Sequence, residues 1–394
     1  MSRLDEVISD LTGGRTSRRQ FVQRAAALGL SVPVLSVATS GLLSASAQAK
    51  NEVVWLSPRG TLEVLDDYPY WVAKKMGYFG DLKTQMLPAI IEATSSSKAV
   101  AEKKADMSYV SPGVFSLGVE AGIDLVSVWE MGAYDVFNIA LQKGKPLGVK
   151  TLKDLEGKTV ALGDAGWSGI VDPMIAQAGG DPGKVKYVAA GPTWGQTLQA
   201  GQADAALSWE GLRAQWLAGG LEFDYILGKD WSKFPANSFQ IRRSDFEDAT
   251  LKDLYTNYLK GWAMGLEFGQ QNPRAATQIT MESEPIAKAL QDTFKDKGIA
   301  VESMWQLATV YRGDWASRDG GKWGWHSMES WQTFLDVIKK IGQLTKDIKA
   351  ADIVKNDYTV GGNAFDKAKV KADADAFALS AEFKAVAVPK GAGA

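Results

Sequence analysis

Residues 152–161 are Leu152-Lys153-Asp154-Leu155-Glu156-Gly157-Lys158-Thr159-Val160-Ala161. The polar part ends in Gly157 and predicts a turn, because glycine accommodates backbone angles that other residues avoid. The apolar part continues to Leu162 and predicts a short, buried strand. A turn that leads into a fully buried strand is typical of a parallel sheet, so this segment indicates an α/β fold.

Patterns of strands and helices alternate on both sides of this segment. Upstream, short apolar runs predict strands at about 53–56, 86–91, 106–110 and 125–129. Downstream, further strands are predicted at 159–162, 185–189, 203–207 and 239–241. After about residue 244 the periodicity is helical and includes an amphipathic helix capped by Ser327. The alternation predicts two sets of βαβ units followed by a helical C-terminal extension.

The composition of connecting segments predicts the domain boundaries. Lys143-Gly144-Lys145-Pro146 is a basic connector with Gly and Pro, where we place the boundary between two lobes. We expect lobe 1 to comprise 50–145 and 240–360, and lobe 2 to comprise 146–239. A tail over 361–394 is expected to form a surface helix followed by disorder.

Residues 1–49 predict a twin-arginine signal peptide. Arg18-Arg19 precede a mildly apolar run that ends in Ala47-Gln48-Ala49, an A-x-A pattern that predicts cleavage after Ala49. A membrane anchor is the alternative, but Gly29 and Pro33 interrupt a run that is shorter than the ~20 apolar residues a bilayer needs. The predicted location of the mature chain is the periplasm.

The composition excludes several classes of function. The chain has no Cys and one His, which excludes iron–sulfur clusters, c-type haem and thiolate zinc sites, so we expect no metal and no cofactor. The one histidine, His326, precedes a helix and is expected to pack or to cap rather than to catalyse. Removal of the signal changes the net charge from −2 to −4, and no basic stripe is present, which disfavours a nucleic-acid partner.

Four segments resemble one family in their order and spacing. They are 71–79 (Trp-Val-Ala-Lys-Lys-Met-Gly-Tyr-Phe), 105–109 (Ala-Asp-Met-Ser-Tyr), 152–161, and 198–206 (Leu-Gln-Ala-Gly-Gln-Ala-Asp-Ala-Ala). Together they resemble the nitrate/sulfonate/taurine-type solute-binding proteins of ABC importers, and also the thiamine-pyrimidine precursor binders that share their fold.

The resemblance implies a two-lobed, periplasmic-binding-protein-like fold of type II, with a mostly parallel sheet flanked by helices in each lobe. It implies a monomeric, non-enzymatic receptor that closes on a small solute and delivers it to a permease and ATPase in the membrane. An enzyme related to thiamine-pyrimidine synthases and a sensor for a signalling partner are the alternatives. The lack of Cys disfavours the enzyme, because those synthases have a Cys-rich signature.

Ligands of parallel α/β sheets bind beyond the carboxyl ends of the strands, so the loops at those ends hold the candidate residues. The loop after the first strand contains a dense set of polar and aromatic side chains: Arg59, Asp66, Tyr68, Tyr70 and Trp71. The rings are expected to stack on a flat ligand, and Arg59 or Asp66 to pair with its charge. The next two strand ends contribute Ser111, Pro112, Glu130 and Tyr134.

The corresponding loops of lobe 2 contribute Asp164, Gly166, Trp167, Ser168, Trp194, Trp209 and Glu210. Pro173 predicts that the next helix begins at that residue with Asp172 as its N-cap, which weakens the case for anion binding at Ser168. The three tryptophans follow three strands and are expected to meet at one edge of the cleft. We call them the Trp box.

The charge of these loops favours one class of solute over another. Asp66, Glu130, Asp164 and Glu210 outnumber Arg59, which favours a flat, neutral or cationic nitrogenous heteroaromatic solute. A sulfonate-like or nitrate-like solute is the alternative that the family resemblance supports.

Overall fold

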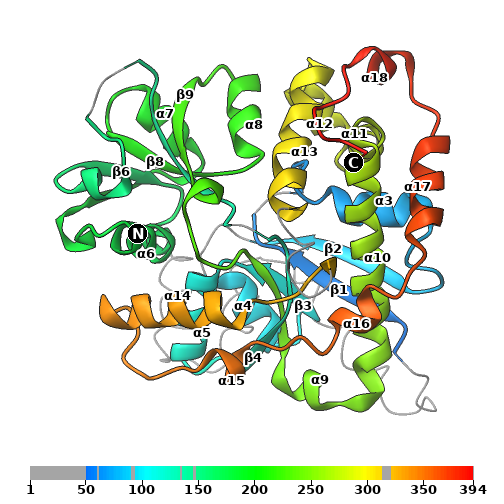
Figure 1. Ribbon diagram of the computed structural model, residues 1–394, viewed down its shortest axis with the longest axis horizontal. Coiled ribbons are helices and arrows are strands. Elements are labelled where there is room, and N and C mark those ends of the chain that lie inside the picture. The colour runs from blue at the N-terminus through cyan, green and yellow to red at the C-terminus, as the bar shows by residue number, and fades with distance from the viewer. Residues whose placement is uncertain are drawn as a thin grey trace, which may run out of the picture. The chain divides into compact units, whose positions relative to one another are not determined.

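The computed structural model describes residues 50–59, 62–89, 94–133, 135–144, 148–312 and 321–393. The signal peptide prediction, with Arg18, Arg19 and cleavage after Ala49, lies outside these residues, as does Tyr134. Within them, the strands form two five-stranded sheets, sheet A and sheet B (Figure 1). The alternation of strands and helices predicted from the sequence is confirmed.

Sheet A has the strand order β2-β1-β3-β10-β4. Its strands are β1 (Glu52–Ser57), β2 (Lys83–Pro88), β3 (Met107–Val110), β4 (Leu125–Glu130) and β10 (Ser238–Arg242). β1 is parallel to both β2 and β3, whereas β10 is antiparallel to β3 and β4. The carboxyl ends of β1, β3 and β4 therefore lie at the same edge as the amino end of β10.

Sheet B has the order β7-β6-β8-β5-β9. Its strands are β5 (Phe137–Gln142), β6 (Thr159–Leu162), β7 (Lys186–Ala189), β8 (Ala205–Trp209) and β9 (Phe223–Leu227). β6 is parallel to β7 and β8, and β5 is antiparallel to β8 and β9. The buried strand predicted after Gly157 is β6, with the predicted bounds.

The chain passes between the sheets twice, after β4 and after β9. The first passage precedes β5, so the chain leaves sheet A before Asp135 and not at residue 145 as expected. Lys143 and Gly144, the described part of the predicted connector, follow β5, which already belongs to sheet B, so they do not mark the boundary between the lobes. The two passages are joined, because Ser232 Oγ donates to Asp135 Oδ2 at 2.7 Å and the Ala236 N–H donates to Glu130 Oε1 at 3.0 Å.

Sheet A is associated with α3 (Tyr68–Met76), α4 (Ser95–Ala101), α5 (Pro112–Glu120) and α9 (Arg243–Glu247). The C-terminal part adds α10 (Lys252–Gln271), α11 (Pro273–Met281), α12 (Ala287–Thr293), α13 (Lys297–Arg312), α14 (Met328–Lys340), α15 (Ala350–Ile353), α16 (Thr359–Gly362), α17 (Lys367–Ala376) and α18 (Ala381–Ala385). Helix α10 packs against α3 and α17, while α13 reaches α8 of the other lobe. Ser327 accepts from the Ser330 N–H, which confirms the predicted cap of α14.

Sheet B is associated with α6 (Ser168–Gln177), α7 (Trp194–Gln199) and α8 (Leu212–Ala218). The predicted start of α6 at Pro173 is wrong, since the helix begins five residues earlier and Pro173 lies inside it. A proline at this position lacks the N–H that would bond to the Gly169 carbonyl. A Cβ at Gly113 of α5 would lie 2.2 Å from that Gly169 oxygen, so the freed carbonyl sits against the first turn of a helix from the other sheet.

The tail differs from its prediction. A helix forms in it, α17, but the residues beyond it are also ordered against the protein. Phe383 of α18 is buried, and the Gly393 N–H donates to the Gln270 carbonyl at 2.9 Å. The Ala-rich sequence conceals this packing because in α17 and α18 only Val370, Ala374 and Phe383 are fully buried, while other tail residues such as Phe377 and Val386 pack against the core partly exposed.

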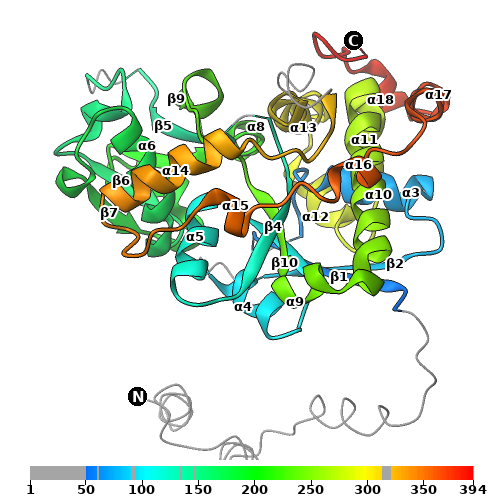
Figure 2. The same ribbon diagram turned by 60° about the horizontal axis from the view of Figure 1, so that its bottom comes forward.

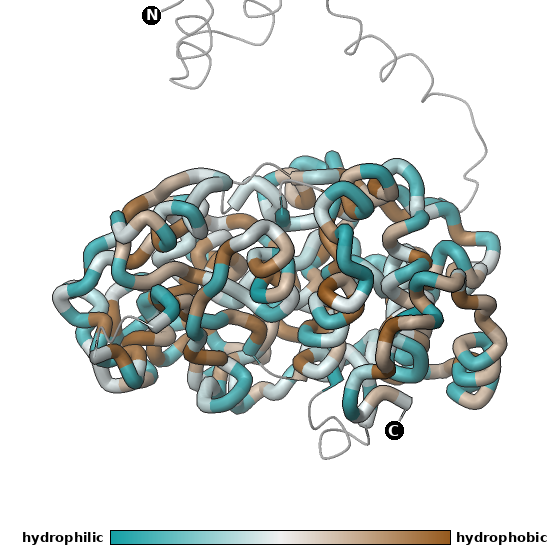
Figure 3. Tube along the Cα trace, turned by 90° about the horizontal axis from the view of Figure 1, so that it is seen from above, coloured by the Kyte–Doolittle hydropathy of each residue, from teal (hydrophilic) through white to brown (hydrophobic). Residues whose placement is uncertain are grey.

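Hydrophobic segments run through the interior and hydrophilic ones gather on the outer turns (Figure 3). In sheet A, Trp55 contacts Tyr70, Tyr109, Phe239 and Trp262, with ring centroids 5.3 to 5.9 Å apart. Helix α14 packs against α6 of lobe 2, as Figure 2 shows. The Gln343 amide donates to Asp172 Oδ2 at 3.1 Å, so the C-terminal part also binds lobe 2.

Candidate functional site

A cavity of about 430 Å³ lies where the edges of the two sheets face each other. Ligand pockets of small organic molecules have volumes of this order. From the sheet A side it is lined by Arg59, Val64, Tyr109, Ser111, Val114, Met131, Asn237, Leu307 and Tyr311. From the sheet B side it is lined by Val136, Phe137, Trp167, Ile170, Trp194, Leu207, Trp209 and Trp216.

The strand ends explain why these residues meet. Arg59 follows β1, Ser111 follows β3, and Met131 follows β4, all at one edge of sheet A. Asn237 precedes the antiparallel strand β10 and reaches the same edge from the other direction. The cavity therefore occupies the position expected for a ligand of parallel α/β sheets.

The Trp box forms one wall of the cavity. The ring centroids of Trp167 and Trp194 are 5.5 Å apart, those of Trp167 and Trp209 are 6.2 Å apart, and those of Trp194 and Trp209 are 5.9 Å apart. Trp194 Nε1 donates to the Leu207 carbonyl at 2.8 Å, which fixes its ring. A Cβ at Gly163 would lie 2.4 Å from the Trp167 ring, so glycine is required there. The predicted convergence of the three rings is confirmed.

The opposite wall carries a charged group of four residues, which we call the Arg59 cluster: Arg59, Asp66, Asp67 and Tyr109. Arg59 Nη2 lies 2.9 Å from Asp66 Oδ1, and Nη1 lies 3.2 Å from Asp67 Oδ1. The Tyr109 hydroxyl contacts both Arg59 and Asp67. Asp66 and Asp67 are buried behind the guanidinium, with exposed fractions of 1% and 0%.

One hydrogen bond joins the two walls. Trp209 Nε1 of the Trp box donates to Asp66 Oδ1 at 3.0 Å, across 143 residues of sequence. Asp66 thus accepts from a cation of its own lobe and from an indole of the other lobe. The arrangement holds the two edges together at the cavity.

Burial controls the protonation of these groups. Burial raises the pKa of Asp66, an effect that the Arg59 charge opposes and Asp67 reinforces. Burial also raises the pKa of the Tyr109 phenol well above its ordinary value, so that it stays neutral and hydrogen-bonded. The carboxylates Asp66 and Asp67 outweigh the burial of Arg59 and keep its pKa well above the ordinary value.

Several predicted residues line the cavity and others do not. Arg59, Ser111, Trp167, Trp194 and Trp209 line it, and Asp66 lies directly behind two of them. Ser111 caps α5, accepting from the Val114 N–H at 3.2 Å, and Pro112 is the first residue of that helix. Gly166 and Ser168 lie at the start of α6 beside the cavity residue Trp167, but neither lines the cavity.

The aromatic residues predicted to stack on a ligand from α3 are in the core instead. Tyr70 packs between Trp55, Trp71 and Phe79, and its hydroxyl donates to the Thr84 carbonyl at 3.3 Å. Tyr68 stacks on Tyr311, with ring centroids 6.4 Å apart. The helical periodicity of α3 turns the Tyr68 ring towards Gly269 of α10 and the Tyr70 ring towards β1 and β2, and neither residue lines the cavity.

The acidic residues predicted near Arg59 are engaged elsewhere, apart from Asp66. Glu130 accepts from the Ala236 N–H, and Asp164 accepts from the Gly166 N–H at 2.8 Å. Glu210 accepts two bonds from Arg213, at 2.9 and 2.6 Å. These carboxylates stabilise the loops and helix starts in which they occur, so they do not set the charge of the cavity.

Sequence reasoning missed several residues of the site, among them Asp67, Tyr109, Tyr311 and Asn237. Asp67 is adjacent to Asp66, and Tyr109 lies two residues before Ser111, so both were within the segments considered. Tyr311 belongs to the last turn of α13, which approaches through the helical extension. Asn237 follows the second passage between the sheets, and its local sequence has no signal of a strand end.

His326 is fully buried, as expected for a packed histidine. Its Nε2 lies 2.8 Å from Ser127 Oγ, and its Nδ1 lies 3.0 Å from Asn356 Oδ1. These residues do not line the cavity. In the described ranges no group of three or more metal-binding side chains occurs, and no helix there has the length and apolar character to cross a bilayer.

The chain matches the model of a family described as NMT1/THI5 like over residues 66–276. No curated protein matches its sequence.

Several solved structures are similar to the chain. The alkanesulfonate-binding protein SsuA of Xanthomonas axonopodis pv. citri, solved with bound MOPS, is 13% identical, covers 79% of this chain and 100% of that one, and has a TM-score of 0.58. The periplasmic aliphatic sulphonate-binding protein SsuA of Escherichia coli is 14% identical, with coverages of 77% and 92% and a TM-score of 0.57. A ligand-binding component of an ABC-type import system from Staphylococcus aureus, solved with zinc, is 11% identical, with coverages of 79% and 98% and a TM-score of 0.56.

At these identities the structures show a common fold, and they confirm the two-lobed, type II architecture expected from the sequence. The family match is a separate finding, and it spans more than half of the 394 residues. The chain therefore belongs to the NMT1/THI5-like family.

Proposed function

We propose that this protein is the extracytoplasmic solute-binding receptor of an ABC-type importer, which captures a small organic molecule between its lobes and delivers it to a membrane permease. The observation that carries the proposal is the cavity with one wall from each sheet, bridged by the bond between Trp209 and Asp66. The similar folds of solute-binding proteins support it.

In this proposal the residues that line both walls hold the solute. A flat ring would stack against the Trp box, where indole faces supply a large apolar surface. Polar groups of the solute would meet Tyr109, Ser111 and Asn237 on the opposite wall. A solute that contacts both walls stabilises the closed arrangement over an open one, because it binds the closed form better.

The aromatic lining and the volume of the cavity favour a flat organic solute of modest size. Its walls are mostly aliphatic and aromatic, with few polar atoms. A nitrogenous heteroaromatic compound fits these walls. Sulfonates are bound by two of the similar proteins and are the alternative solute class.

A thermal-shift screen of the mature chain from Lys50 tests the proposal. A ligand that binds the folded state alone raises its stability by RT ln(1 + [L]/Kd), which is about 2.7 kcal/mol at 100 times Kd. Quenching of tryptophan fluorescence should accompany a true solute, because four indoles line the cavity: Trp167, Trp194, Trp209 and Trp216. A broad panel of small organic solutes that causes neither a shift nor quenching would argue against a receptor.

Delivery to a permease requires export, which we propose occurs through Arg18 and Arg19 with cleavage after Ala49. Replacement of both arginines by lysine should retain the precursor in the cytoplasm, and fractionation of cells measures this. An enzyme of the same fold is the competing function. Turnover of a bound solute by the purified protein would favour it.

A further inference from the structure

The cavity contains one charged side chain among its described lining residues, Arg59. A lone buried guanidinium would attract an anion such as a sulfonate, since its planar donors match oxyanions. The class of solute therefore depends on whether Arg59 offers its charge to the cavity.

Arg59 is already paired on both of its terminal nitrogens. Asp66 Oδ1 lies 2.9 Å from Nη2, and Asp67 Oδ1 lies 3.2 Å from Nη1. Both carboxylates are buried, and two negative charges more than offset one positive charge. An anion that displaced either carboxylate would leave it buried without its cation, which is strongly unfavourable.

Displacement of Asp66 has a second cost. Its Oδ1 also accepts the indole N–H of Trp209 from the other lobe. An anion that drew Arg59 away from Asp66 would weaken the contact that joins the two walls. Binding of an anion and closure of the lobes are therefore opposed at this carboxylate.

Asn237 offers a neutral polar group instead. Its Oδ1 is buried and has no hydrogen-bond partner among the described residues, although the side chain lines the cavity. A buried amide oxygen without a partner is unfavourable, and a donor on the solute would satisfy it. Among its described residues the cavity therefore lacks a hydrogen-bond donor for Asn237 Oδ1, and a solute with an N–H group supplies one whereas an anion does not.

We propose that Asp66 and Asp67 set the charge selectivity of the cavity by neutralising Arg59. The cavity then rejects anionic rings and accepts neutral or cationic rings whose N–H groups reach Asn237. This inference rests on the proposed function. Asp66 is the residue that couples selection to closure, because it alone of the two carboxylates bonds to Trp209.

Three rings of matched size test the proposal: benzamide, benzamidinium and benzenesulfonate. Calorimetric titration of the mature chain should show benzamide and benzamidinium binding at least tenfold more tightly than benzenesulfonate. Asp66→Asn removes one negative charge and should lower the ratio of benzamidinium to benzenesulfonate affinity at least tenfold. Arg59→Gln, a second variant, should bind benzenesulfonate more weakly than the wild type does.

Asp245→Asn is the matched control, because it makes the same change of net charge beside another buried arginine, Arg242, which does not line the cavity. It should leave the affinity ratio unchanged. Preference of the wild-type chain for benzenesulfonate, or equal ratios in the wild type and Asp66→Asn, would overturn the inference and leave the receptor function standing. Failure of all three rings and of the wider panel to bind would overturn both.

Discussion

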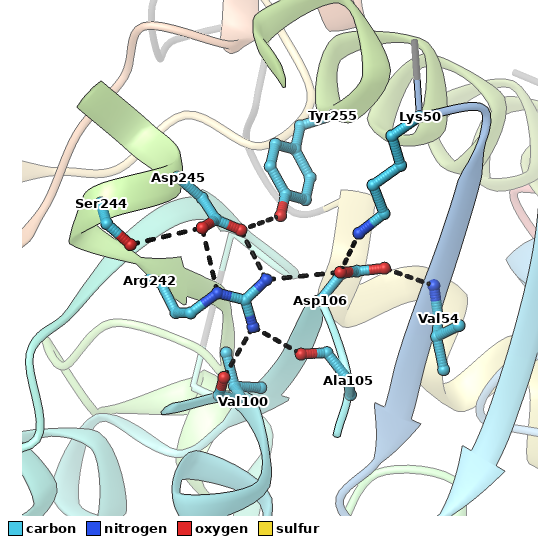
Figure 4. A network of polar contacts seen from close by, with 9 residues as sticks. All are labelled: Lys50, Val54, Val100, Ala105, Asp106, Arg242, Ser244, Asp245 and Tyr255. Atoms are coloured by element: carbon cyan, nitrogen blue, oxygen red, sulfur yellow. Dashed lines mark hydrogen bonds and ion pairs between the residues drawn. The ribbon is translucent and has the colours of Figure 1, made fainter. Parts of the chain in front are cut away.

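Two clusters of the same composition lie at opposite ends of sheet A. The Arg59 cluster borders the cavity, where β1 and β3 end. The second, the Arg242 cluster, comprises Arg242, Asp106, Asp245 and Tyr255, and lies where β3 begins and β10 ends (Figure 4). Each cluster joins one arginine to two aspartates and a tyrosine, but only the first contributes lining residues to the cavity between the sheets.

The Arg242 cluster uses its guanidinium completely. Nε and Nη2 donate to Asp245 at 3.0 and 2.6 Å, Nη2 lies 3.3 Å from Asp106, and Nη1 donates to the carbonyls of Val100 and Ala105 at 2.6 and 2.7 Å. Asp106 also contacts Lys50 and accepts from the Val54 N–H (Figure 4). This cluster ties β1, α4, β3 and α10 together and has a structural role.

The comparison teaches that residue types do not distinguish a functional cluster from a structural one. The difference lies in the edge of the sheet, because ligands approach parallel strands at their carboxyl ends. Four predictions test this difference, beginning with the largest expected effect.

Arg242→Ala should lower the free energy of unfolding by roughly 3–5 kcal/mol, because it leaves the buried Asp245 without its cation and removes one of the two cations that contact Asp106. Urea unfolding measures the loss. Solute affinity should stay within about twofold in conditions where the variant is folded, because the cluster is remote from the cavity. A loss of affinity beyond that without loss of stability would contradict the structural role.

Trp209→Ala should weaken solute binding by roughly 30-fold or more, which corresponds to about 2 kcal/mol, because it removes a stacking face and the bond to Asp66. Calorimetry measures the change. Trp209→Phe is the matched control that keeps a ring without the N–H. Its affinity for the solute should lie between those of the wild type and Trp209→Ala. Equal affinities in all three proteins would remove Trp209 from the site.

Asp135, which joins the two passages between the lobes, should make stability depend on pH. Burial raises the pKa of Asp135 from 3.8 to about 6, so between these values the folded chain binds a proton that the unfolded chain releases. Unfolding free energy should therefore fall as pH rises from 5 to 7, by about 1–2 kcal/mol from this group. Asp135→Asn should remove that part of the slope in urea titrations at both pH values. An unchanged slope would show that Asp135 is not its source.

Ser111→Ala and Ser327→Ala each remove a helix cap and should each cost about 1 kcal/mol of stability. Comparison of the two variants distinguishes an effect on stability from an effect on solute binding, because Ser111 lines the cavity and Ser327 does not. Thermal melts with and without solute should show equal losses of stability and a smaller solute-induced shift for Ser111→Ala alone. An equal reduction in both variants would mean that the shift follows stability.

Much of the fold was predictable because local patterns carry it. The strand at 159–162, the amphipathic face of α14 and the cap at Ser327 follow from the period of apolar residues and from capping chemistry. The start of α6 was not predictable in this way. Local preference disfavours a helix across Pro173, yet packing against α5 sustains one.

Site residues were predictable where the position of a strand end alone places them at the cavity. Trp167, Trp194 and Trp209 meet because carboxyl ends of neighbouring parallel strands lie at one edge. The aromatic pair Tyr70 and Trp71 was misplaced, because both rings of the helix α3 are buried in the core and do not line the cavity.

The sequence by itself determined the family, the alternation of strands and helices, and the edge of each sheet where a ligand would bind, because each follows from residues close in the chain. Packing of the chain decided which acidic side chains reach Arg59, that Trp209 bonds to Asp66 from the other lobe, and that the Arg242 cluster does not line the cavity between the sheets. Two of these facts depend on contacts between distant residues, since 143 positions separate Asp66 from Trp209 and 136 separate Asp106 from Arg242. Packing of the whole chain, and not any local pattern, brings such residues together.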